Sequence, residues 1–159
     1  MTGMRARLQE ALPALFAHEG IWDGTYRHMD CEGKLLETHR MRTRCEFPDD
    51  GEFAYIQHNH LIFPDGREHR LSFGGVFRDG LLHWDTDRFS GTGWETRDNV
   101  LMLTLHRKDE PNVRFTEMIQ ISDDGNTRAR TWQWLRDGTP FKRTLCDEAR
   151  VTRDREAEL

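Results

Sequence analysis

The sequence contains few cysteines and no long hydrophobic run, and each shortage excludes a class of protein. The three cysteines, Cys31, Cys45 and Cys146, are widely spaced and form no CxxC pair, so neither a disulfide framework nor a zinc knuckle is indicated. We expect these cysteines to be reduced and partly buried. No stretch approaches the roughly 18 uncharged apolar residues that span a bilayer.

The charge balance also lacks the excess of one sign that marks some binding proteins. Lysine and arginine number 23 against 28 aspartates and glutamates, and the formal net charge is -5. We therefore expect neither a nucleic-acid partner nor a membrane-binding surface. The first ten residues, MTGMRARLQE, lack the apolar segment of a secretory signal, which favours a cytoplasmic location.

The length of 159 residues predicts one domain. Leucine, isoleucine, valine and phenylalanine make up only about a fifth of the chain, but five tryptophans and nine phenylalanines can supply a core. Turn-forming pairs separate segments rich in strand-forming residues, which predicts nine or ten consecutive antiparallel strands. The clearest strand segments are 53–63, 71–77, 100–106, 113–122 and 127–135.

Leu8, Leu12 and Leu15 predict a helix at the start of the chain, which we expect to end near Gly20 despite Pro13. One short helix followed by many strands favours an all-β, up-and-down antiparallel barrel, since closure removes exposed sheet edges. A two-layer sandwich is the alternative. The expected divisions are a helix packing on the barrel at 1–19, the barrel at 20–151 and a charged tail at 152–159.

Trp22 lies at the start of the first predicted strand, where it can plug one end of a barrel. Tyr26 shares its face by alternation and is a candidate ligand-binding residue in the lumen. The strand at 55–60 leaves two orientations open. Tyr55, Gln57 and Asn59 facing inward would form a hydrogen-bonding wall, whereas His58 and His60 facing inward would form a His-x-His pair for a metal, a reading that the following residues do not favour.

His83 and Asp85 alternate on one strand face, and a carboxylate beside an imidazole can build a general base. A solvated face, or a weak surface ion pair between Asp85 and Arg88, would produce the same pattern. Glu117 is a carboxylate in an otherwise apolar strand, which suits either an acid or base catalyst or a structural pair with Arg130.

Arg130, Trp132 and Trp134 share a face of the next strand. The two indole rings can form either the wall of an aromatic ligand site or simple core. GxSxG, HExxH, P-loop and strand-linked GxGxxG motifs are all absent, which argues against serine hydrolases, phosphoryl transfer and nicotinamide redox chemistry. We therefore expect no cofactor and no metal.

Several motifs occur together in one order along residues 18–151. They are HEGIWDGTY, YIQHN, FPDG, WDTDRFSGTGW, EMIQIS, RTWQW with a following DG, and KRTL. In this set the chain resembles lipocalin-like (calycin) single-domain proteins of a bacterial and cyanobacterial family of unknown function.

The resemblance implies a barrel with an N-terminal helix, closed at one end by Trp22 and open at the other. It implies no established activity, although cyanobacterial bilin lyases are similar in fold. The motifs carry over Tyr55, Gln57, Asp85, Glu117, Arg130 and Trp132 as recurrent positions, which favours Tyr55, Gln57 and Asn59 facing the lumen.

The first functional hypothesis is a barrel that encloses a small aromatic or conjugated molecule and performs cofactor-independent acid–base chemistry of the isomerase, lyase or hydratase type. In that hypothesis Glu117, Asp85, His83 and Tyr55 are catalytic, and Tyr26, Gln57, Asn59, Arg130, Trp132 and Trp134 bind the ligand. A non-catalytic carrier or sensor is the second hypothesis, and a filled structural barrel is the third. The sequence leaves homo-oligomerisation open.

Overall fold

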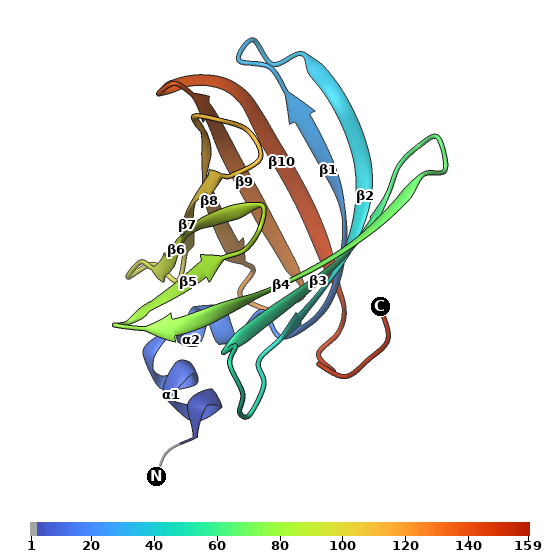
Figure 1. Ribbon diagram of the computed structural model, residues 1–159. Helices are drawn as coiled ribbons and strands as arrows, with labels where there is room; N and C mark the ends of the chain where they lie inside the picture. Colours follow the sequence, from blue (N-terminus) through green and yellow to red (C-terminus); the bar gives the residue numbers. More distant parts are fainter. Residues whose placement is uncertain (1–2) are drawn as a thin grey trace.

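The computed structural model describes residues 3–159 as a closed barrel of ten antiparallel strands with two short helices at one end (Figure 1). The helices are α1 (Met4–Ala11) and α2 (Pro13–Phe16). The strands are β1 (Gly20–Met29), β2 (Leu35–Glu46), β3 (Tyr55–Ile62), β4 (Glu68–Arg78), β5 (Leu81–Asp85), β6 (Phe89–Glu95), β7 (Leu101–Arg107), β8 (Val113–Ile121), β9 (Thr127–Arg136) and β10 (Thr139–Thr152). Each strand pairs with its neighbour in sequence, and β1 pairs with β10. This confirms the all-β, up-and-down, lipocalin-like barrel and excludes the sandwich.

Tight turns hold the consecutive strands in register. Asp79 and Gly80 join β4 to β5 with φ of 54° and 78°, and Asp137 and Gly138 join β9 to β10 with φ of 51° and 79°. A two-residue hairpin of type I′ needs positive φ at both central positions, which explains why Asp-Gly pairs marked these turns in the sequence.

The helical segment differs from the single helix expected from the leucine spacing. It breaks at Leu12, which has φ of -132°, because a residue before proline is driven out of the helical region. The second helix then starts at Pro13, whose fixed φ suits a first helical position. The carboxylate of Glu95 accepts a hydrogen bond from the backbone N–H of Ala14, which ties this helix to β6.

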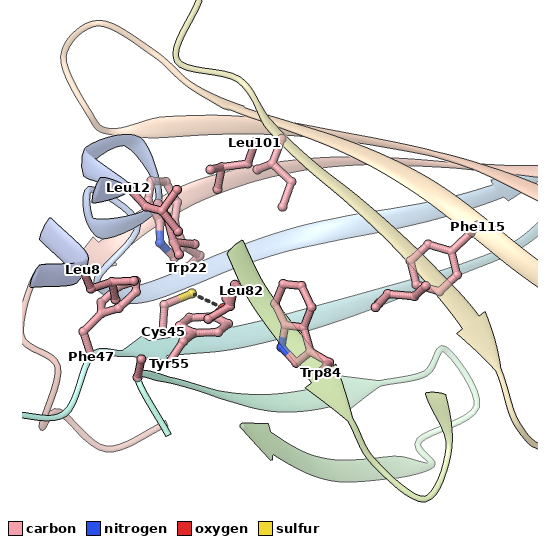
Figure 2. Close-up of a cluster of buried hydrophobic side chains, with 14 of the residues drawn as sticks. Leu8, Leu12, Trp22, Cys45, Phe47, Tyr55, Leu82, Trp84, Leu101 and Phe115 are labelled. Atoms are coloured by element: carbon pink, nitrogen blue, oxygen red, sulfur yellow. Dashed lines mark hydrogen bonds between the residues drawn. The ribbon is translucent and has the colours of Figure 1, made fainter. Parts of the chain in front are cut away.

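The helices cover one end of the barrel, here called the base. Leu8, Leu12 and Leu15 are buried there against Trp22 and Phe47, and Figure 2 shows several of these side chains between the helices and the strands. The opposite end, the mouth, is formed by the loops 30–34, 63–67, 86–88, 108–112 and 137–138. Neither helix within residues 3–159 is long and apolar enough to cross a membrane.

Trp22 closes the base, as the resemblance implies. Its side chain is fully buried, and its indole N–H donates to the carbonyl oxygen of His18 at 2.9 Å. The guanidinium carbon of Arg128 lies 4.5 Å from the ring centroid and that of Arg150 lies 4.2 Å from it. Cation–π contacts of this kind add to the energy of burying the ring.

Candidate functional site

A cavity of about 500 Å³ extends from the base helices toward the mouth. Ligand pockets in proteins commonly have volumes in this range. Its lining includes Leu12 and Leu15 at the base and His28 and Lys142 near the mouth. The barrel is therefore not filled, which contradicts the third hypothesis.

The strand β3 turns its amide and phenol groups toward this cavity. Tyr55, Gln57 and Asn59 line it, and all three are buried. Tyr55 donates to Gln57 Oε1 at 2.7 Å, and Gln57 Nε2 donates to Asn59 Oδ1 at 2.8 Å. Thr43 on β2 donates to the same asparagine oxygen at 3.1 Å. These groups form a continuous polar row along one wall, in the orientation that the resemblance favours.

The histidines of β3 face outward instead. His58 contacts Ser72 at 2.8 Å and Glu46 at 3.2 Å, while the Nε2 of His60 lies 2.9 Å from Glu68. These two histidines therefore place no metal-coordinating group in the cavity. Within residues 3–159, no three His, Cys, Asp or Glu side chains lie together in an arrangement that could hold a metal ion.

His83 and Asp85 also lie on the outer face of the barrel. The prediction that they face the cavity as catalytic residues is therefore wrong. Leu82 and Trp84 occupy the inward positions of β5, because burying these two large apolar side chains sets the strand's register. His83 contacts the carbonyl oxygen of Arg78 at 3.2 Å, and Lys108 lies 2.5 Å from the exposed carboxylate of Asp85. The geometry gives the pair no access to a ligand in the barrel.

Glu117, Arg130 and Tyr26 meet in the interior. Arg130 Nε donates to Glu117 Oε1 at 2.6 Å, and Arg130 Nη1 donates to the Tyr26 hydroxyl at 2.5 Å. All three side chains line the cavity and are at least nine-tenths buried. The ion pair anticipated from the sequence thus exists, and it adjoins the space in which a ligand would lie.

A second ion pair, which the sequence reasoning missed, lies beside the first. Arg128 donates two hydrogen bonds to Glu148, at 2.9 and 3.0 Å, and Arg130 Nη1 lies 3.6 Å from the same carboxylate. Alternation along β9 could have identified Arg128, because it precedes Arg130 by two residues. Glu148 lies opposite Arg128 across the ladder between β9 and β10.

The two buried carboxyls have opposite pKa shifts. Burial raises the pKa of Glu117, and Arg130 offsets this only in part. Burial also acts on Glu148, but the two arginines outweigh it and hold the pKa of Glu148 below its ordinary value. Glu148 therefore serves as the counterion of the two arginines, whereas Glu117 is the carboxyl better suited to gain or lose a proton.

Aromatic rings from β8 and β9 form another wall of the cavity. Phe115 stacks on Trp132 with centroids 5.2 Å apart and planes 13° apart, and Trp134 lies 4.6 Å from Phe115. Tyr26 meets the edge of Trp132 at 5.9 Å. Trp132 is only partly buried, so this wall keeps an accessible surface.

A group of side chains on β1, β2 and β10 was not anticipated as part of the site. The rings of His28 and His39 stack 5.2 Å apart, and His39 also stacks on Tyr26. Trp134 Nε1 donates to the hydroxyl of Thr144, which leaves that hydroxyl free to donate to His28 Nδ1 at 2.8 Å. Burial, followed by Lys142 and His39, lowers the pKa of His28 to about 4, so this ring is neutral near pH 7.

Some polar groups of the lining lack a partner. Among the described residues, Trp132 Nε1, Trp84 Nε1 and His39 Nδ1 are buried atoms without a hydrogen bond. The Trp132 N–H lies near the Glu117 carboxyl and lowers its pKa. The geometry between the two groups is nevertheless not that of a hydrogen bond. Buried polar groups are ordinarily paired, so a ligand with hydrogen-bond acceptors would complete this lining.

The comparisons with known proteins support the fold. No protein-family model and no curated protein matches this chain. The S-type phycobiliprotein lyase CPES from Guillardia theta superposes with a TM-score of 0.69 and 14% sequence identity, covering 87% of this chain and 90% of that one. A protein of unknown function from the DUF3598 family of Nostoc punctiforme superposes with a TM-score of 0.66 and 15% identity, covering 86% of this chain. The match spans about half of that protein's length, 49%. At these identities the likeness establishes a shared lipocalin-like barrel.

Proposed function

We propose that the barrel binds a small aromatic or conjugated molecule in its central cavity. The observation that carries this proposal is the cavity of about 500 Å³ with the stacked Phe115 and Trp132 on one wall. Flat apolar walls favour conjugated ligands through offset stacking. The similar barrel of a phycobiliprotein lyase agrees with a ligand of this class. We also propose a cytoplasmic location for the protein.

We further propose that Glu117 exchanges a proton with the bound molecule. Its carboxyl faces the cavity, its pKa is raised by burial, and Arg130 connects it to the Tyr26 hydroxyl. A carboxyl with a raised pKa gains and loses a proton more readily near neutral pH, and Tyr26 can donate to an oxyanion that develops on the ligand. This arrangement suits isomerisation, elimination or hydration without a cofactor.

The alternative is a carrier or sensor in which the same groups only bind. The short contact between Glu117 and Arg130 favours it, because a carboxylate held by a guanidinium can be purely structural. Glu117→Gln separates the two functions. A catalyst loses turnover of the identified substrate while retaining its affinity, whereas a carrier shows no turnover with either residue.

Binding itself is tested first by mass spectrometry. The protein purified from its own organism is measured under native and denaturing conditions, and a retained molecule appears as a mass difference. Since an enzyme need not retain its substrate, the decisive measurement is a fluorescence titration with the uncharged aromatic probe N-phenylnaphthylamine. Absence of binding of both this probe and its sulfonated analogue, anilinonaphthalene sulfonate, by the wild-type protein would contradict the proposed function.

The variant Trp132→Leu places the probe in the cavity. We expect its affinity for N-phenylnaphthylamine to fall about tenfold, because truncating a buried aromatic contact commonly costs more than 1 kcal/mol. Gln133→Ala is the matched control, since Gln133 is exposed on the outer face of the same strand. Equal affinities in all three proteins would place the probe outside the barrel.

A further inference from the structure

Charged side chains of both signs line the cavity. The chain carries a formal net charge of -5. The lining has five cationic side chains against three carboxylates. The cations are Arg88, Arg107, Arg128, Arg130 and Lys142, and the carboxylates are Asp87, Glu95 and Glu117. A cation of this lining favours an anionic ligand only where no protein carboxylate already neutralises it.

Most of these cations already have partners. Arg128 and Arg130 bind Glu148 and Glu117. Arg107 Nη2 lies 2.6 Å from Asp109, a residue of the mouth. Arg88 is exposed, and solvent can compensate its charge.

Lys142 is different, because it is half-buried and forms no ion pair within residues 3–159. It follows a shift in register between β9 and β10 and lies opposite Trp134. Its ammonium lies 4.2 Å from the centroid of the Trp134 ring and 5.8 Å from that of Phe141. Glu110 and Glu37 influence it only through space, without a hydrogen bond.

We infer that Lys142 binds an acidic group of the ligand, so that the barrel selects aromatic or conjugated molecules bearing a carboxylate or a similar anion at one end. Trp134 follows Trp132 by two residues on the same face of β9 and lies opposite Lys142, so a molecule stacked on Trp132 can place an acidic group beside Lys142. There Lys142 provides a charge that is partly removed from water and has no protein counterion. This inference rests on the proposed binding function and adds the chemical class of the ligand.

A pair of probes tests the inference. Anilinonaphthalene sulfonate and N-phenylnaphthylamine share the same aromatic body, and only the first is anionic. Both are titrated by fluorescence into the wild-type protein, Lys142→Met, which retains an unbranched apolar side chain, and Lys142→Arg, which retains the charge. Lys34→Met is the control for net charge, because Lys34 is exposed in a mouth loop.

We expect Lys142→Met to weaken the anionic probe about tenfold and to change the neutral probe by less than twofold, since hydrogen bonds to charged groups contribute at about this level. Lys142→Arg and Lys34→Met should bind both probes nearly as the wild-type protein does. Equal weakening of both probes by Lys142→Met, or no weakening of either, would overturn the inference while leaving the binding function intact. Failure of both probes to bind the wild-type protein would overturn the binding function as well.

Discussion

Two tryptophans, Trp22 at the base and Trp132 in the cavity wall, differ in how completely their contacts are satisfied. Trp22 has a guanidinium near its ring from both Arg128 and Arg150, and its N–H is bonded. Trp132 stacks on Phe115 but remains partly exposed, and its N–H has no partner among the described residues. A side chain with every contact satisfied contributes to folding, whereas one with unsatisfied contacts is available to a ligand.

The largest expected effect is the loss of stability when the tryptophan at the base is truncated. Trp22→Ala should lower the free energy of unfolding by about 4–5 kcal/mol, because it leaves a cavity in a fully packed cluster. Trp132→Leu should cost about 1 kcal/mol, since its ring already borders empty space. Urea denaturation measures both values. Similar losses for the two variants would mean that the upper cavity is as important to folding as the base.

The next effect concerns the buried ion pair between these regions. Glu117→Leu should lower the free energy of unfolding by about 3–4 kcal/mol, because it leaves the Arg130 guanidinium without its counterion. Adding Arg130→Met should recover at least half of that loss, since the double variant buries no unpaired charge. A double variant as unstable as Glu117→Leu alone would show that Arg130 is held mainly by Tyr26 and Glu148.

The smallest expected effect is on how the stability of the folded protein depends on pH. The pKa of His28 is about 4 in the folded protein and 6.5 in an unfolded chain. Between these values the unfolded chain takes up a proton that the folded ring does not, so stability falls as the pH decreases from 6.5 to 4. His28→Asn should show a shallower fall across this window. The size is modest because His28 is only partly buried.

Denaturant titrations at several pH values measure this slope. The raised pKa of Glu117 contributes with the opposite sign, because the folded carboxyl takes up a proton at a higher pH than the unfolded one. His106→Asn is the control, since His106 is exposed on β7. An unchanged slope in His28→Asn would assign the acid sensitivity to the other groups with a lowered pKa, among them His18, His39 and Glu148.

Sequence alternation identified much of the interior. Tyr26, Glu117, Arg130, Trp132 and Trp134 all line the cavity, and each shares its predicted strand face with other large or apolar side chains. Alternation groups residues by face but does not say which face is inward. For β3 the resemblance supplies that choice. For β5 the sequence pattern favours the polar face of His83 and Asp85, whereas the structure turns Leu82 and Trp84 inward.

The groups missed by the sequence analysis depend on long-range pairing. Glu148 and Thr144 become significant only when β10 lies between β9 and β1, which places them against Arg128 and His28. Lys142 looks in sequence like an ordinary charged residue near a turn. Its lack of a counterion is a property of the folded barrel and has no local signal.

The pairing of β1 with β10 also determines how the chain must assemble. Every other neighbouring pair is a hairpin whose strands follow one another, but this ladder joins Ile21 to Thr152 and Met29 to Arg143. Closing so long a loop has the highest entropic cost of any step in forming the sheet. The same step brings Arg150 against Trp22 and the Tyr26 hydroxyl against Arg130. Barrel closure and completion of the buried charge network are therefore a single folding event, and a nascent chain acquires its cavity only after β10 has been synthesised.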